Sequence, residues 1–91
     1  MAKEEMKIIQ VTDVIERIKD VISKDYPNSK VFDKNVAYEL RTSPGALAVQ
    51  KSRNLISYDA LTMFCIRRKV NTNWLFFGIG DMEMDHAKKD L

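Results

Sequence analysis

A short break in an apolar pattern between residues 36 and 54 constrains the fold of this chain most. Before the break, apolar residues repeat at the spacing of one helical face, at Val36, Ala37 and Leu40. Ser43 then suits an N-cap, because its hydroxyl can accept a hydrogen bond from an early helical N–H. Pro44 suits the first helical position, since the N–H that it lacks would have had no partner there. The stretch therefore predicts two short helices joined by a tight turn, the second running from Ser43 to about Lys51.

A broad apolar stripe predicts a longer helix before this pair, from about Asp13 to Lys24. Asp13 followed by Glu16 forms an approximate capping box at its start. The stripe needs a core to cover it and consists of Val14, Ile15, Ile18, Val21 and Ile22. Asp33 is the expected cap of the helix that ends near Leu40.

Two more helices are expected after the pair. Ser57 is the expected N-cap of the first, whose inward positions are apolar, at Leu61, Phe64 and Cys65. The second spans about Asn73–Phe77 and stops at Gly78. With three glycines and few alternating apolar runs, the chain does not favour strands. We therefore expect an all-α fold, a compact bundle of about five short helices that contains a helix-turn-helix.

Basic residues are concentrated in the middle of the chain. Residues 41–69 hold six lysines and arginines against Asp59 as their one acid, whereas residues 1–40 and 70–91 each hold more acids than bases. This positive charge lies on and after the second helix of the pair, where nucleic-acid phosphates would be met. A solvated basic face is the plain alternative. Two short helices joined by a turn, the second ending in bases, are typical of a domain that places a helix in the major groove of DNA.

The length of 91 residues allows one domain. We expect residues 1–12 to form an N-terminal arm or an early turn, residues 13–80 a helix-turn-helix DNA-binding domain, and residues 81–91 a flexible C-terminal tail. The chain has no apolar run of membrane-spanning length, and its charged N-terminus does not resemble a signal peptide. A single cysteine suits a reducing compartment, so a cytoplasmic location is expected.

The residues do not predict an enzyme, a metal site, a cofactor or a small-molecule ligand. The sequence shows no nucleophile–histidine–acid set and no glycine-rich phosphate loop. Cys65, a predicted buried hydrophobe, and His86, in the tail, are too few for a zinc site. Acids at 81, 83 and 85 lack the glycine and closing glutamate of a calcium loop, and we interpret them as a solvated tail.

The region from about Val14 to Gly80 resembles the N-terminal helix-turn-helix domain of phage CI-type (lambda-like) repressors. The match runs without a gap, and its most specific part is the ending NTNWLFFGIG. The residues that carry the resemblance are Val36, Ala37, Leu40, Ser43, Leu47, Lys51, Arg53, Asn54, Ile56, Tyr58, Cys65, Asn71, Trp74, Leu75, Gly78 and Gly80. Two positions depart from the pattern: Arg41 stands where the family has the glycine of the turn, and Gln50 replaces an apolar residue.

The resemblance implies sequence-specific binding of double-stranded DNA at an operator and transcriptional repression, usually by a homodimer. The recognition helix is expected to span Ser43–Ser52. The candidate DNA-contacting residues are Lys34, Asn35, Ser43, Pro44, Gly45, Ala46, Ala48, Val49, Gln50, Lys51, Ser52, Arg53 and Asn54. Ala48 and Val49 are suited to thymine methyl groups, although this face offers few bidentate base contacts.

Several alternatives remain open for the charged and aromatic candidates. Lys51 and Arg53 are expected at phosphates, and a bridge to a nearby acid is the competing interpretation. Plain solvation is as good an interpretation for Lys34 and Asn35. Arg67, Arg68 and Lys69 are expected to complement the helix dipole and to aid solubility. The candidates for a dimer interface are Trp74, Phe76 and Phe77. The alternative function is a degenerate helix-turn-helix that binds a partner protein through its small apolar face.

Overall fold

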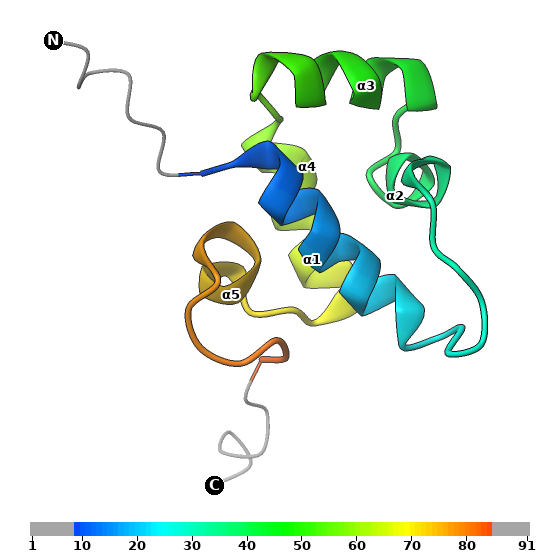
Figure 1. Cartoon of the computed structure of the whole chain (residues 1–91). Coiled ribbons are helices and arrows are strands. Elements are labelled where there is room, and N and C mark those ends of the chain that lie inside the picture. The colour runs from blue at the N-terminus through cyan, green and yellow to red at the C-terminus, as the bar shows by residue number, and fades with distance from the viewer. Residues whose placement is uncertain (1–8, 85–91) are drawn as a thin grey trace, which may run out of the picture.

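Five helices and their connections make up residues 9–84, the part of the chain that this computed structural model describes (Figure 1). In chain order they are α1 (Val11–Ser23), α2 (Asp33–Glu39), α3 (Pro44–Arg53), α4 (Tyr58–Arg68) and α5 (Thr72–Phe77). The predicted all-α bundle of about five short helices is thereby confirmed. Among residues 9–84 the β structure is an isolated bridge between Val70 and Glu83.

Helix α1 is the element around which the others pack. It contacts α2, α3 and α5, and α4 contributes side chains to the same core. Every residue of the predicted apolar stripe is buried, and so is Val11, which precedes it. The helix begins at Val11 with Gln10 as its N-cap, so the predicted start at Asp13 and its capping box with Glu16 are wrong. The helix extends further because Val11 belongs to the core, so the predicted arm of residues 1–12 ends inside α1.

Side-chain caps begin α3 and α4 as predicted. The Ser43 hydroxyl accepts a hydrogen bond from the Ala46 N–H at 3.0 Å, and the Ser57 hydroxyl accepts one from the Ala60 N–H at 3.1 Å. The prediction that Asp33 caps α2 is wrong. Phe32 occupies the N-cap position, and its N–H donates to the side-chain oxygen of Asn35 at 2.8 Å. The Asp33 carboxylate is instead held by lysines of two other helices.

The chain after α5 returns to the bundle. The N–H of Asn71 donates to the carbonyl of Met82 at 2.8 Å, and that of Met84 to the carbonyl of Lys69 at 3.2 Å. Met82 is also half-buried against the core. Residues 81–84 are therefore part of the fold, which corrects the expectation of a tail from residue 81. Residues 1–8 and 85–91, with His86, lie outside the described part of the chain.

No helix within residues 9–84 combines the length and the apolar character that crossing a bilayer requires.

Candidate nucleic-acid interface

Helix α3 lies across one end of the bundle with one face uncovered (Figure 1). Its inner face is anchored by Leu47, which is fully buried in the core, and the helix contacts α1 and α2. The outer face and the N-cap expose a stripe of small side chains: Ser43, Pro44, Gly45, Ala48, Val49 and Ser52. These six candidates from the sequence therefore share one accessible surface, which we call the α3 outer face.

The turn before α3 has the left-handed backbone that its place in the sequence requires. Arg41 has φ of 60°, a conformation that usually favours glycine, and its side chain is exposed. The N–H of Arg41 donates to the carbonyl of Tyr38 at 3.1 Å, and that of Thr42 to the carbonyl of Ala37 at 2.9 Å. These bonds end α2 and turn the chain within residues 40–43, so that α3 starts at a fixed angle to α2.

Gly45 leaves the first turn of α3 without a side chain on its exposed surface. A Cβ added at this position would meet no atom within 4 Å, so the described part of the chain does not need a glycine here. Glycine inside a helix costs roughly 0.5–1 kcal/mol relative to alanine. The residue therefore weakens α3 slightly and leaves its backbone open to close approach from outside.

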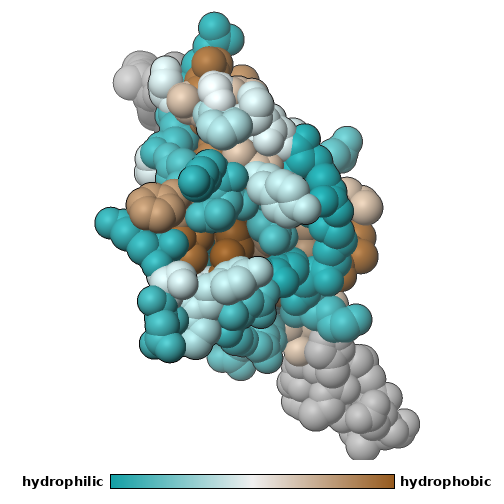
Figure 2. Space-filling model, turned by 90° about the vertical axis from the view of Figure 1, so that its right-hand side faces the viewer, coloured by the Kyte–Doolittle hydropathy of each residue, from teal (hydrophilic) through white to brown (hydrophobic). Residues whose placement is uncertain are grey.

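Three basic side chains on or before α3 in the chain are exposed. Arg53, at the end of the helix, is exposed and has no hydrogen bond or ion pair with residues 9–84. Arg41 in the turn and Lys34 in the first turn of α2 are exposed as well. Hydrophilic side chains also cover most of the side of the molecule that carries α2, where hydrophobic surface shows in a central hollow (Figure 2).

Lys51 is not one of these free cations. Its ammonium group lies 2.7 Å from one carboxylate oxygen of Asp33, and the ammonium group of Lys19 lies 2.8 Å from the other. The hydrogen bond from Lys19, followed by that from Lys51, lowers the pKa of Asp33, and the hydrogen bond to Asp33 raises the pKa of Lys19. Lys51 therefore forms the bridge to a nearby acid that was its competing interpretation. This corrects the expectation that Lys51 is available to bind phosphates.

Two asparagines predicted at the DNA are used inside the fold. Asn35 caps α2 through its side-chain oxygen. Asn54 ends α3 in a left-handed conformation, and its side-chain oxygen accepts a hydrogen bond from the Val11 N–H at 2.8 Å. The remaining two candidates on α3, Ala46 and Gln50, are half-buried. These four side chains therefore lie beside the α3 outer face and not on it.

Arg67 and Arg68 make tertiary contacts that the sequence did not indicate. Arg67 donates to the carbonyl of Glu39 at the end of α2. Arg68 pairs with Asp25 at 2.9 Å and lies 3.6 Å from the Glu39 carboxylate. Both arginines thus connect α4 to α2 or to the loop after α1, beyond the expected role at the helix dipole. Their partners are distant in sequence, so helical periodicity carries no signal for them.

Comparisons with known protein families, with curated proteins and with solved structures gave no match for this chain.

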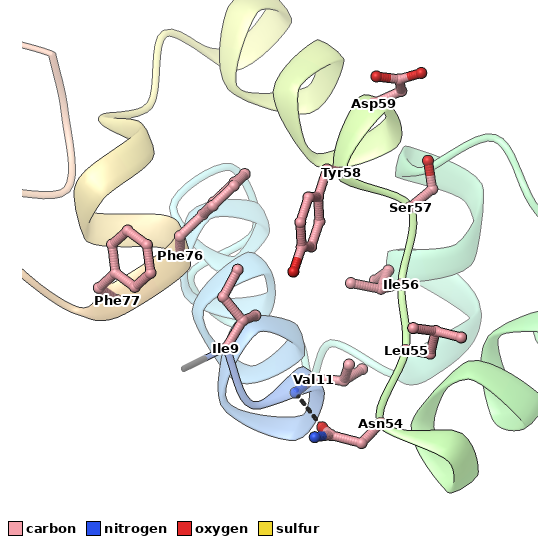
Figure 3. Close-up of a pocket in the computed structure, with 10 residues that line it drawn as sticks. All are labelled: Ile9, Val11, Asn54, Leu55, Ile56, Ser57, Tyr58, Asp59, Phe76 and Phe77. Carbon is pink, nitrogen blue, oxygen red and sulfur yellow. Dashed lines mark hydrogen bonds between the residues drawn. The ribbon is translucent and has the colours of Figure 1, made fainter. Parts of the chain in front are cut away.

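Two of the predicted interface aromatics, Phe76 and Phe77, line a separate groove of about 880 Å³ (Figure 3). Phe76 faces Tyr58 across it with 5.9 Å between ring centroids, and Phe77 packs on Phe76 at 6.0 Å. Phe77 is 42% exposed, whereas Trp74 and Phe76 are half-buried against the core. The groove is lined by Ile9, Val11, Phe76, Phe77 and residues 54–59. The exposed Leu55 and Tyr58 were not assigned to this groove from the sequence. The available signal was Leu55, an apolar residue in the connection between two predicted helices.

Proposed function

We propose that this chain binds double-stranded DNA sequence-specifically by placing the α3 outer face in the major groove. The observation that carries the proposal is the accessible stripe of small side chains on α3, presented by a short turn and flanked by free cations. The major groove admits an α-helix, and a helix whose outer face carries short side chains can approach the base edges closely. The sequence resemblance adds the biological role, transcriptional repression at an operator of phage or prophage type in the bacterial cytoplasm.

Each part of the surface has a distinct proposed contact. Ala48 and Val49 meet thymine methyl groups, and the hydroxyl of Ser52 bonds to a base edge or a phosphate. Arg53 and Arg41 contact phosphates on the two sides of the groove, and Lys34 adds a contact at the start of α2. The phosphate contacts fix the register of the helix without reading sequence.

Fluorescence anisotropy with a random-sequence duplex pool and with its selected winners, at two salt concentrations, tests the proposal. We expect winners to bind ~10³-fold or more tightly than the pool at matched salt. Equal, steeply salt-dependent binding to both would reduce the surface to a basic patch. No binding to either at low salt would overturn the proposal.

Charge-removing variants locate the interface. Arg53→Gln should weaken binding to all sequences and flatten the slope of log K against log salt by about 0.9. Lys69→Asn is the matched control, because Lys69 is an exposed cation at the far end of α4 and asparagine tolerates its left-handed backbone. If the slope flattens in Lys69→Asn and stays unchanged in Arg53→Gln, the phosphates are not contacted by Arg53 and the proposed interface is wrong.

A second candidate function is binding of a partner protein through the same face. Val49 is 49% exposed, and its neighbours Pro44 and Ala48 extend the small apolar surface. Under this alternative, Val49→Glu abolishes partner binding, while DNA binding is weak and indifferent to sequence. Loss of operator binding in Val49→Glu, with pool binding retained, would favour DNA.

A homodimer belongs to the main proposal, since one short helix reads few base pairs and a second half-site multiplies its affinity. Among the predicted interface aromatics, Phe77 is the exposed one. Phe77→Ser should shift the chain toward the monomer in sedimentation experiments. An unchanged sedimentation coefficient across a wide concentration range would remove Phe77 from the interface.

A further inference from the structure

A single carboxylate lies between ammonium groups from two different helices. Asp33 is the first residue of α2, Lys19 belongs to α1, and Lys51 lies in the last turn of α3. The two lysines approach opposite oxygens of Asp33, at 2.8 Å from Lys19 and 2.7 Å from Lys51. The Glu16 carboxylate of α1 also lies 3.6 Å from the Lys19 ammonium group, whereas Asp33 is the one ion-pair partner of Lys51 among residues 9–84. Asp33 therefore links all three helices and offsets the charge of Lys51.

We propose that Asp33 withholds Lys51 from the DNA backbone and thereby limits sequence-independent binding. The inference rests on the proposed DNA binding and concerns how selective that binding is. Each lysine that neutralises a phosphate adds affinity for every sequence alike, because it releases a condensed counterion. A lysine engaged by a carboxylate must first give up that partner, so its contribution to indiscriminate binding is reduced.

The contrast between two bases in the last turn of α3 supports the inference. Arg53 is exposed without a partner among residues 9–84, whereas the side chain of Lys51 is 35% exposed and directed to Asp33. Arg53 is therefore free to meet a phosphate and Lys51 is not. Weaker binding to random sequence increases the ratio of specific to non-specific affinity, and competition from the genome makes this ratio the relevant quantity.

A double-mutant cycle tests the proposal on random and winner duplexes. Asp33→Asn should release Lys51, steepen the slope of log K against log salt by about 0.9 and tighten binding to random duplex roughly tenfold at low salt. The ratio of winner to random affinity should fall. Lys51→Gln alone should leave the slope unchanged, yet in the Asp33→Asn background it should remove about 0.9 of the added slope.

Asp20→Asn is the charge-matched control, because Asp20 is an exposed carboxylate on α1 outside this ion-pair group. Its random-duplex affinity should rise less than that of Asp33→Asn. Circular dichroism and thermal unfolding ensure that each variant is compared while folded.

Several outcomes overturn the proposal. An unchanged salt slope in Asp33→Asn does so. A rise in random-duplex affinity in Asp20→Asn equal to that in Asp33→Asn does so too. A flattened slope in Lys51→Gln alone would show that Lys51 already meets a phosphate. Weaker binding to both duplexes at an unchanged slope would leave Asp33 a purely structural role. If the wild type binds no duplex, the proposed function fails as well; if it binds while the cycle is flat, this inference fails alone.

Discussion

The side-chain oxygen of Asn54 accepts a hydrogen bond from the backbone N–H of Val11 at 2.8 Å, across 43 positions of the sequence. Asn54 also ends α3, with φ of 53° in the left-handed region. Val11 is the first residue of α1, and its N–H is one that a helix cannot satisfy internally. One residue thus ends α3 through its backbone and satisfies the start of α1 through its side chain, which connects α3 to the central helix.

Removal of this acceptor should destabilise the whole bundle. Asn54→Gly keeps the left-handed backbone accessible and removes the hydrogen bond, so we expect a loss of about 1–2 kcal/mol in the free energy of unfolding. Asn54→Asp retains an acceptor and should therefore keep most of the stability that Asn54→Gly loses. Urea unfolding at pH 7 measures both, and a glycine variant as stable as the wild type would contradict the role assigned to Asn54.

Two glycines should respond to alanine in opposite directions. Gly45→Ala should stabilise the chain by about 0.5–1 kcal/mol, since its Cβ meets nothing and alanine favours a helix. Gly78→Ala should destabilise it by about 1–2 kcal/mol, because Gly78 has φ of 75° and a Cβ would lie 3.1 Å from the guanidinium of Arg17. Thermal unfolding of the pair checks this. Shifts of the same sign would contradict it.

The Asp33 group should make stability depend on pH at the acidic end. The lowered pKa of Asp33 means that its contribution is present above the ordinary carboxyl pKa of 3.8 and disappears as the pH falls through the lower folded value. Because the group is partly exposed, we expect the free energy of unfolding of Asp33→Asn to be about 1 kcal/mol lower than that of the wild type at pH 7. This difference should shrink below about pH 4. Lys19, whose pKa is raised, loses its contribution only as the pH rises above 10.5. Urea unfolding across pH 2.5–7 measures the difference, and one that persists at the lowest pH would contradict the ion-pair origin.

Cys65 should be inert while the chain is folded. The thiol is buried, and burial raises its pKa to about 11, so little thiolate exists near neutral pH and a reagent has no access. Labelling at pH 8 should therefore follow unfolding and accelerate with urea. Cys65→Ser should reduce the free energy of unfolding by about 1–3 kcal/mol through burial of a hydroxyl, and Cys65→Ala should reduce it less. Fast labelling without denaturant would show that the α4 site opens locally.

Helix positions followed from the sequence because their signals are local. Ser43 and Ser57 cap helices through groups only three residues away, and the spacing of Leu61, Phe64 and Cys65 directs one face inward. Arg41 adopts the left-handed backbone of the turn although it departs from the glycine of the pattern. Periodicity thus indicated the five helices and the accessible face of α3, and the serine caps fixed the starts of α3 and α4, whereas the predicted caps of α1 and α2 were wrong.

Tertiary structure decided how the polar side chains are used. Asp33 holds lysines from two other helices, and Asn54 and Arg67 bind backbone groups far away in the sequence. A charged or amide side chain carries no periodic signal, and its partner is whichever group the packed helices bring within hydrogen-bond distance. The sequence therefore determined which helices form and which face of α3 is open, whereas the packing of those helices decided that Lys51 binds Asp33 while Arg53 has no partner among residues 9–84.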